Sequence, residues 1–237
     1  MASLLLAYGH HADQDGQWMR FTQQLGPWGQ PKLVVDNRPQ SVLGDVQGSN
    51  AQYEFSGYLE GLDAMLERHG PQARILVFND SLFSHHSRRR WADFLRGYVP
   101  KKGPGVYGDS RTEPILIDGA PLVHLASWMF ILEGSGGQRA FREALVHCID
   151  QFDQDPDWPG YASFLEHYYA PSRRWGGYTQ ALSAQDLQRK MRCSWAEHRL
   201  SRHLQNQGVM HPLQGIHYQA LHSVDRLLSA SKRLRSK

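Results

Sequence analysis

Three apolar segments of the sequence each end in polar residues that are suited to binding a nucleotide. The first segment ends in Tyr8 to His11, the second in Asp36-Asn37 and the third in Asn79-Asp80-Ser81. If the segments are neighbouring parallel strands, their carboxyl ends form one ligand crevice. One carboxylate there would contact a base or ribose, and another would lie near a phosphate-bound divalent cation. The simpler alternative is that Asp36 and Asp80 cap the turns that follow the strands.

Two other clusters combine histidines with charged residues, and each has a structural alternative. His10-His11 precede Asp13 to Gly16, which brings together residue types that bind metals, at a spacing that fits no strong metal template. Asp13 to Gly16 also indicates a turn and a helix N-cap. His85-His86 precede Arg88 to Arg90. This second cluster indicates either the start of a solvated helix or three arginines that grip an anion.

Hydrophobic periodicity predicts the elements that would position these residues. Short apolar strands are expected over Ser3–Gly9, Lys32–Asp36 and Arg74–Phe78, with helices over Gln14–Leu25 and Gln52–His69 between them. The resulting β-α-β-α-β order is typical of an α/β sheet whose parallel strands are joined by crossover helices.

The next segments continue this alternation. A helix is expected over Ser87–Tyr98, a Gly/Pro-rich loop over Lys101–Gly105, a strand over Leu122–Leu132 and a helix over Gln138–Phe152. The segment Asp153–Pro159 is rich in Asp and Pro and is the predicted boundary between two parts of the chain. We therefore expect an α/β domain over residues 1–155 and a mostly helical, basic extension over residues 156–237 that packs on it.

Composition excludes several classes of protein. Of the 237 residues, 41% are hydrophobic and 21% charged, which excludes a disordered tail or a fibre. No apolar run approaches the roughly 20 residues of a membrane-spanning helix. Ser3–Ala7 is too short for a signal peptide and lacks its basic flank, so a cytoplasmic protein is expected. The two cysteines, Cys148 and Cys193, are too few for a disulfide scaffold and are expected to be free thiols.

The formal net charge of +3 combines an acidic body with a basic end. From Ser172 onward the chain has 12 Lys and Arg against 3 Asp and Glu, a charge of +9, whereas residues 1–171 have 14 against 20, a charge of −6. The basic region is either a solvated helical cap on the sheet or a surface that attaches to an anionic membrane. Nucleic acid is not expected as a partner, because no nucleic-acid motif accompanies the charges.

A series of short motifs, taken in chain order, resembles one enzyme family. The motifs are Tyr8–Gly16, Val34–Asn37, Gly48–Asn50 leading into Glu54–Leu62, Ile75–Ser81 and His124–Phe130, with a looser match at Tyr107–Glu113. Together they resemble the nucleotide-binding half of GT-A glycosyltransferases, in particular the rhamnan synthesis F type of bacterial polysaccharide biosynthesis. The resemblance covers roughly residues 3–150. It implies a GT-A-like (Rossmann-like), mostly parallel sheet flanked by helices, with the basic helical region as a C-terminal appendage.

The resemblance also implies an activity. A glycosyltransferase of hexosyltransferase type would move a sugar from a nucleotide-sugar donor to a glycan or lipid-linked glycan acceptor. The product would be a bacterial surface polysaccharide of the rhamnan, O-antigen or capsule type, made in the cytoplasm or peripherally on the inner membrane face. The alternative is a catalytically inactive relative that binds a nucleotide sugar, a glycan or a protein partner.

Roles for individual residues follow from the same resemblance. The residues that would bind the nucleotide sugar are Tyr8, Gly9, Asp36, Asn37, Glu54, Gly57, Asn79, Asp80 and Ser81. Asp36 would contact the nucleotide, with Tyr8 and Gly9 lining the base, and Glu54–Gly57 would close over the donor. The family's Asp-x-Asp appears here as Asn-Asp-Ser. Either Asp80 alone helps to hold Mg²⁺ or Mn²⁺ on the diphosphate, or the donor binds without a metal.

For two further sets of residues, the sequence is compatible with either a chemical or a structural role. Asp109 and Glu113 are candidates for the base that deprotonates the acceptor hydroxyl, or they only make a loop soluble. His124, Ser127 and Trp128 would line the acceptor side, with Trp128 stacking on a sugar ring. The alternative for this second set is a core strand in which apolar residues alternate.

Overall fold

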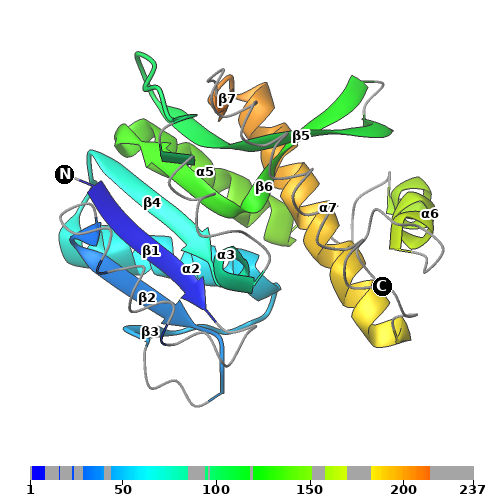
Figure 1. Ribbon diagram of the computed structural model, residues 1–237, viewed down its shortest axis with the longest axis horizontal. Coiled ribbons are helices and arrows are strands. Elements are labelled where there is room, and N and C mark those ends of the chain that lie inside the picture. The colour runs from blue at the N-terminus through cyan, green and yellow to red at the C-terminus, as the bar shows by residue number, and fades with distance from the viewer. Residues whose placement is uncertain are drawn as a thin grey trace, which may run out of the picture.

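A seven-stranded, mostly parallel sheet runs through the part of the chain that the structure describes (Figure 1). The structure is a computed structural model, and it describes residues 2–8, 16, 23, 29–39, 44–84, 94–95, 97–117, 120–150, 158–169 and 183–213. The strand order is β3-β2-β1-β4-β6-β5-β7, and of these strands β6 alone is antiparallel to its neighbours. The strands are β1 (Ala2–Tyr8), β2 (Lys32–Asp36), β3 (Val46–Gln47), β4 (Arg74–Asn79), β5 (Gly105–Ile117), β6 (Ala120–Glu133) and β7 (Met210–Pro212).

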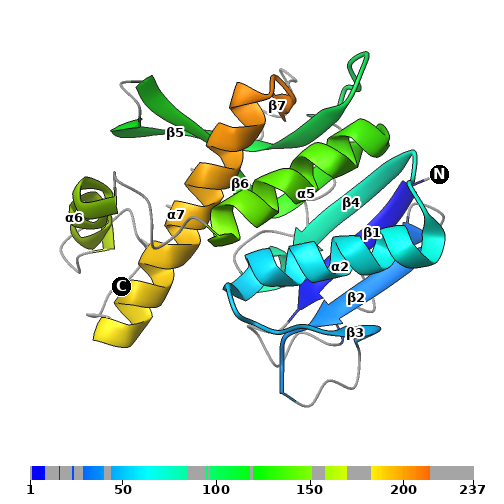
Figure 2. The ribbon, with the colours of Figure 1, turned by 180° about the vertical axis from the view of Figure 1, so that it is seen from behind.

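Helices pack on this sheet, which confirms the expected α/β architecture. α2 (Tyr53–His69), α5 (Gly134–Asp150) and α7 (Ala184–Asn206) lie on one face (Figure 2). The short α3 (Ser81–Ser84) belongs to the core of the other face, and α6 (Trp158–Tyr169) packs beside α7. The larger core joins the sheet to α2, α5 and α7 through nearly fully buried side chains, among them Val35, Val77, Phe130, Tyr58, Phe141 and Trp195.

The chain after residue 155 contributes to this core and to the sheet. Trp195, Leu200 and Leu204 of α7 are at most 2% exposed and belong to the same cluster as α5 and the strands. β7 adds a parallel strand to β5 at the edge of the sheet. The described part of the predicted basic extension therefore completes the α/β core instead of only resting on its surface.

The strands that follow β1 in the sequence are added first on one side of it and then, from β4 onward, on the other. β2 and β3 are added outward from β1 in that order, and α2 then returns the chain to β4, on the other side of β1. The carboxyl ends of β1 and β4 consequently flank a topological switch point. Open α/β sheets leave a crevice for a ligand at such a point.

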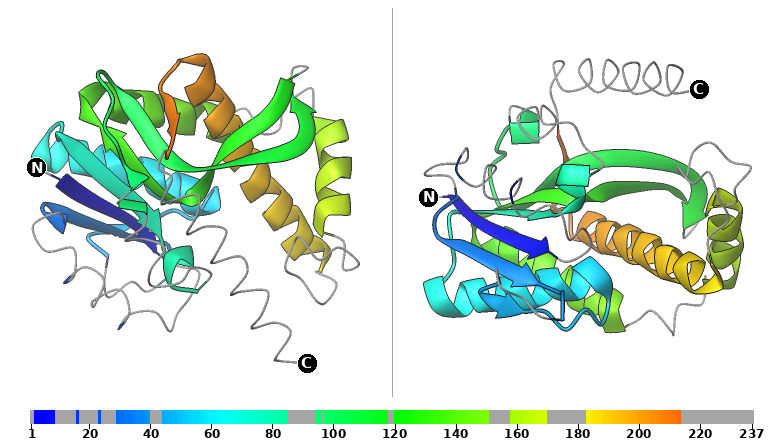
Figure 3. Two further views of the ribbon diagram at one scale, coloured as in Figure 1. Left: turned by 45° about the horizontal axis from the view of Figure 1, so that its top comes forward. Right: turned by 60° about the horizontal axis from the view of Figure 1, so that its bottom comes forward.

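β5 and β6 form a long antiparallel arm that curves over α7 (Figure 3). β6 pairs with β4 only as far as Met129, opposite Phe78, but its pairing with β5 continues to the far end of the arm. The prediction of a loop around Tyr107–Glu113 is wrong, because this segment is part of β5 and takes its hydrogen bonds from β6. An arm that extends beyond the parallel strands tolerates polar residues that a buried central strand would not.

Side chains of α7 accept hydrogen bonds from the backbone of β6 where β6 no longer pairs with β4. The Ser201 hydroxyl accepts the Leu125 N–H at 2.9 Å and donates to the Glu197 carbonyl at 2.8 Å. The Glu197 carboxylate accepts the Ser127 N–H at 2.5 Å. Buried backbone donors need such partners, since leaving one unpaired costs about 1–3 kcal/mol. α7 is therefore docked to β6 by hydrogen bonds to the backbone as well as by apolar packing.

The predicted boundaries of several elements agree with the structure. The strands predicted over Lys32–Asp36 and Leu122–Leu132 match β2 and β6, and the helix predicted over Gln52–His69 matches α2. The helix predicted from Gln138 begins earlier, at Gly134. Gly134 has a φ of 64°, a left-handed conformation that glycine adopts readily where β6 turns into α5.

Other predicted elements lie largely outside the described residues. These are the helices over Gln14–Leu25 and Ser87–Tyr98, the boundary segment, and both clusters that combine paired histidines with charged residues. Of the helices in the described ranges, none is both long and apolar enough to cross a bilayer.

Replacing Ser201 by alanine removes the partner of the Leu125 N–H at little cost in apolar contact. We expect Ser201→Ala to lower the free energy of unfolding by about 1–3 kcal/mol, measured by urea denaturation. Ser163→Ala, at an exposed position of α6, is the control and should change this free energy by less than about 0.5 kcal/mol. Equal stabilities of the two variants would show that the docking of α7 does not depend on this hydrogen bond.

Candidate functional site

β1 and β2 end side by side and bring the first predicted site residues together. Tyr8 pairs with Asp36 in the parallel register, and the Asn37 N–H donates to the Tyr8 carbonyl at 2.6 Å. All three side chains are buried. Gly9, the fourth residue predicted for this place, lies outside the described residues. Three residues predicted to contact the nucleotide therefore meet at one point on the carboxyl edge of the sheet.

The carboxylate of Asp36 is bound by Arg38. Asp36 Oδ1 accepts the Arg38 backbone N–H at 2.9 Å, and Oδ2 accepts from the guanidinium at 2.7 Å. The guanidinium lies over the Tyr8 ring, 4.5 Å from its centroid. Asp36 therefore caps the turn after β2, as the simpler alternative predicts, and also holds Arg38 against the ring. Because Asp36 is 0% exposed and Arg38 20%, a ligand at this edge would meet Arg38 first.

The side chain of Asn37 fills the space that two glycines leave. Its Nδ2 donates to the Tyr53 carbonyl at the start of α2, at 3.1 Å. A Cβ on Gly48 would collide with Asn37 Oδ1, and a Cβ on Gly57 would lie 3.1 Å from the Ala7 Cβ and 3.3 Å from the Asn37 amide. The resemblance implies that Gly57 helps to bind the donor, but in the structure the space beside Gly57 is occupied by Asn37 and by Ala7 of β1. The two glycines allow β1, the loop after β2 and α2 to pack closely.

Glu54, in the first turn of α2, is turned toward α7. Its Oε2 accepts a hydrogen bond from the Cys193 thiol at 3.7 Å. Burial raises the pKa of Cys193 well above its ordinary value, and the Glu54 carboxylate raises it further, so the thiol stays protonated and donates. Cys193 and Cys148 are free thiols, as expected. Glu54 thus links α2 to α7, a contact that gives no support to its predicted role in closing over a donor.

β4 ends beside β1, so Asn79 and Asp80 lie across the switch point from Tyr8. Asn79 Oδ1 accepts the Ser81 N–H at 3.1 Å, and Asn79 Nδ2 donates to the Ser127 carbonyl at 3.4 Å. The amide of Asn79 is therefore used within the protein. Asp80, which is 0% exposed, supplies the single carboxylate of the Asn-Asp-Ser motif.

The backbone of Ser127 joins four elements around the end of β4. Its N–H donates to Glu197 of α7, and its carbonyl accepts from Asn79 of β4 and from the Tyr58 hydroxyl of α2, the latter at 2.6 Å. Burial raises the pKa of Tyr58 well above its ordinary value, and the Glu54 and Asp80 carboxylates raise it further, so the hydroxyl remains a donor. Ser127 therefore acts here through its backbone, as a junction between β6, β4, α2 and α7.

The candidates for the base and for sugar stacking lie at separate places along the arm. Trp128 is 3% exposed and packs edge-to-face on Phe94, with 5.3 Å between the ring centroids, so it is a core residue, as the alternative predicts. Asp109 is buried in β5 at a register shift against β6. Glu113 follows four residues later, about 13 Å away along an extended strand.

A cluster that was not predicted from the sequence joins His124 of β6 to Glu197 and His198 of α7; we call it the histidine–glutamate cluster. His124 Nε2 lies 3.6 Å from Glu197 Oε2, and the centroids of the two imidazoles are 4.3 Å apart. Both histidines are buried, and neither Nδ1 has a hydrogen-bond partner among the described residues. Burial lowers the pKa of His198 well below its ordinary value, and His124 lowers it further, so the ring is neutral near pH 7.

The histidine–glutamate cluster also changes the interpretation of His124. The resemblance implies that His124 lines the acceptor side, whereas in the structure its ring faces α7. No local spacing in the sequence connects it with Glu197 and His198, which lie in a segment that is typical of a solvated basic helix. Only the packing of α7 on β6 brings the three side chains together.

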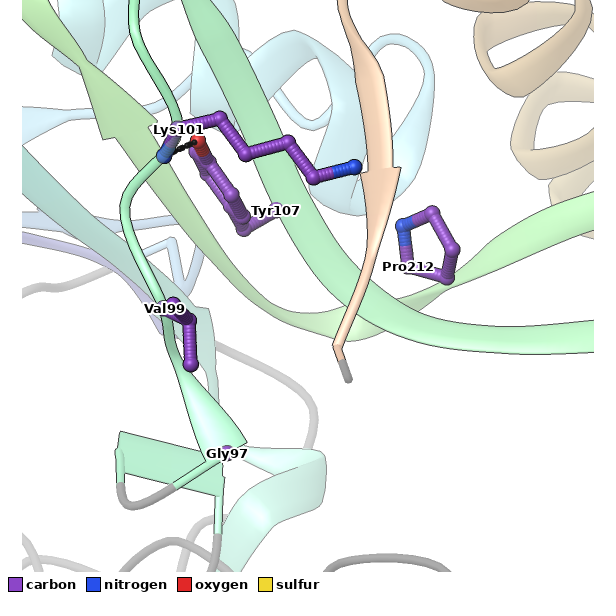
Figure 4. A pocket seen from close by; sticks show the side chains of 5 residues that line it. All are labelled: Gly97, Val99, Lys101, Tyr107 and Pro212. Carbon is purple, nitrogen blue, oxygen red and sulfur yellow. Dashed lines mark hydrogen bonds between the residues drawn. The ribbon is translucent and has the colours of Figure 1, made fainter. Parts of the chain in front are cut away.

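A small hollow lies on a different part of the sheet, where β5 meets β7 (Figure 4). It measures about 40 Å³ and is lined by Gly97, Val99, Lys101, Tyr107 and Pro212. The Tyr107 hydroxyl accepts the Lys101 N–H at 2.8 Å and so ties the lining together. Ligand pockets usually measure about 300–1,000 Å³, so this hollow is too small for a nucleotide.

No protein-family model, no curated protein and no solved structure matches this chain. The function proposed below therefore rests on the geometry of the sheet edge and on the resemblance of the sequence motifs.

Adding a methyl group at Gly48 should displace Asn37. We expect Gly48→Ala to lower the free energy of unfolding by about 1–3 kcal/mol, because the Tyr53 carbonyl holds the Asn37 amide in place. In an Asn37→Ala background the same substitution should cost about 0.5–3 kcal/mol less, measured by denaturation as a double-mutant cycle. Gly16→Ala is the control, since a Cβ there meets no atom of the described residues within 4 Å. Additive effects in the cycle would show that Gly48 does not accommodate Asn37.

Proposed function

We propose that the chain binds a nucleotide-sugar donor at the carboxyl ends of β1, β2 and β4 and acts as a glycosyltransferase. The supporting observation is that Tyr8 and Asp36 lie on one side of the topological switch point and Asp80 on the other. Open α/β sheets bind ligands at such points. The motifs that resemble those of GT-A enzymes contain the same three residues. The proposed reaction transfers a sugar from a nucleoside diphosphate to a bacterial surface glycan.

In this proposal the nucleoside lies over the ends of β1 and β2. The planar Arg38 guanidinium stacks on the Tyr8 ring and is partly exposed, so it offers a flat surface to a base. Asp36 holds the guanidinium in that orientation through its hydrogen bonds. Asp36 is therefore a positioning residue for the Arg38 surface and contributes to nucleotide binding through it.

The diphosphate would lie near the end of β4. Asp80 supplies one carboxylate there, while the Asn79 amide is occupied by Ser81 and Ser127. Mg²⁺ is commonly held by one or two carboxylates together with substrate phosphates. The residues present therefore fit a Mg²⁺ or Mn²⁺ ion that binds together with the diphosphate, and they do not fit one held by the protein alone. Such an ion would neutralise phosphate charge.

A second candidate function is the binding of a nucleotide sugar, a glycan or a protein partner without turnover. Two observations favour it: the motif at the end of β4 contains a single carboxylate, and Asp109, a candidate base, is buried in β5. Release of free nucleoside diphosphate from a nucleotide sugar, with or without an acceptor, separates a transferase from a binding protein.

The acceptor expected for the transferase is a lipid-linked glycan, and we propose that basic residues after residue 172 attach the protein to the cytoplasmic face of an anionic membrane. In the described part, Arg189, Lys190 and Arg192 lie on α7, and Arg189 is placed over the Tyr53 ring, 4.6 Å from its centroid. The basic clusters Arg173-Arg174 and Lys232–Lys237 lie outside the described residues.

Substitution of Asp80 should weaken nucleotide binding in the presence of metal but not in its absence. With Mn²⁺, we expect Asp80→Asn to weaken the binding of the matching nucleoside diphosphate at least tenfold, because a charged ligand to the ion is lost. Without Mn²⁺, affinity should stay equal or rise, because a negative charge near the phosphates is removed. The measurement is the melting shift of the protein with UDP, GDP, ADP, CDP and dTDP and their sugar conjugates.

Glu67→Gln, at an exposed position near the end of α2, is the matched control and should behave as the unchanged protein. Absence of a melting shift with every compound would contradict the donor site. A shift that Asp80→Asn leaves unaltered in both conditions would place the ligand away from β4.

A further inference from the structure

We propose that the histidine–glutamate cluster binds a divalent transition-metal ion, Zn²⁺ above all, between β6 and α7. One nitrogen of each imidazole and one carboxylate oxygen of Glu197 lie within 4.8 Å of one another. Two histidines and one glutamate form a donor set that holds Zn²⁺ in proteins and leaves a fourth position for water or another ligand. The metal site is independent of the proposed glycosyl transfer.

The fold already holds the three side chains near the required positions. The ligand atoms of a tetrahedral Zn²⁺ ion lie about 3.3 Å apart, so the cluster would contract by at most about 1.5 Å. Glu197 Oε1 is fixed by the Ser127 N–H at 2.5 Å, which leaves Oε2 facing His124. His198 is held edge-to-face against Tyr161, with 5.5 Å between the ring centroids. Hydrogen bonds and packing behind the ligands orient them, as in established metal sites.

The burial and charge of the histidine–glutamate cluster favour a bound cation over simple packing of the three side chains. The Glu197 side chain is 19% exposed, and among the described residues no lysine or arginine pairs with it. His124 and His198 are 2% and 4% exposed, with Nδ1 atoms that find no hydrogen-bond partner in the described part of the chain. Buried polar atoms normally have a partner. A bound cation would take one nitrogen of each imidazole as a ligand and neutralise the carboxylate.

The histidine–glutamate cluster differs in chemistry from the end of β4. Asp80 and the phosphates of a nucleotide offer only oxygen ligands, which suit Mg²⁺ and Mn²⁺, whereas imidazole nitrogens favour Zn²⁺. Ser127 connects the two places, because its N–H binds Glu197 and its carbonyl binds the Asn79 amide. An ion in the cluster would therefore fasten α7 to β6 directly beside the switch point.

Zinc retention by the untagged 237-residue chain tests this site. The protein is stripped of metal with a chelator, freed of the chelator, titrated with Zn²⁺ and passed over a gel-filtration column. We expect one equivalent of retained zinc by elemental analysis. The melting temperature should rise by about 5–11 °C at a hundredfold excess over the dissociation constant. Co²⁺ in place of Zn²⁺ should give the visible absorption of a tetrahedral site.

Two variants and a control identify the ligands. Glu197→Gln keeps an oxygen that accepts the Ser127 N–H but loses the carboxylate, and His198→Gln loses an imidazole at similar volume. Each should weaken zinc binding at least about a hundredfold and abolish the melting shift. His69→Gln, at an exposed position on the last turn of α2, should retain one equivalent.

Loss of zinc in both cluster variants with retention in the control supports the site. Absence of zinc from the unchanged protein overturns it. Full retention by Glu197→Gln also overturns it, because the ion would then be bound by other histidines. If circular dichroism shows that His198→Gln does not fold, the result for Glu197→Gln decides.

Discussion

The backbone of β6 from Leu125 to Ser127 is the constraint on which the rest of this structure depends. β6 pairs with β4 only from Met129 to Glu133, so the residues before Met129 must find other partners for the N–H and carbonyl groups on that edge. β6 finds them on α7, through Ser201 and Glu197, and on α2, through Tyr58. A helix from the basic end of the chain is thereby required to complete the sheet, so the charge of that region does not mark a separate appendage.

Side-chain hydrogen bonds hold residues in place on both sides of the switch point. On one side the Ser127 carbonyl holds the Asn79 amide at the end of β4, and on the other Asn37 is wedged beside Gly48 and Gly57. Each of these side chains is thus held through a hydrogen bond to the backbone of a different element. Moving either one would break a partly buried hydrogen bond, so the residues of the proposed site keep their positions without a ligand.

Local patterns predict some of these elements well and others poorly, for physical reasons. β2 is buried from Leu33 to Asp36, and its centre is an unbroken apolar run. Tyr58, Leu62 and Met65 recur at the spacing of one helical face of α2. β5 was missed because it lies in an arm, where polar residues such as those of Asp109–Glu113 are tolerated. The histidine–glutamate cluster leaves no local signal, since its members meet only through tertiary packing.

Charge decides how an anionic ligand can occupy the switch point. Asp36 and Arg38 neutralise each other, so the ends of β1 and β2 offer a diphosphate no net charge. Asp80 adds a buried negative charge, and like charges 4 Å apart repel by about 4 kcal/mol near a protein surface. A diphosphate at the proposed site would therefore either share a divalent cation with Asp80 or turn toward the N-terminus of α2, where the helix dipole and Arg189 favour an anion and Glu54 disfavours one. Because only the first of these arrangements needs a metal, the metal dependence of binding would report which of the two a ligand takes.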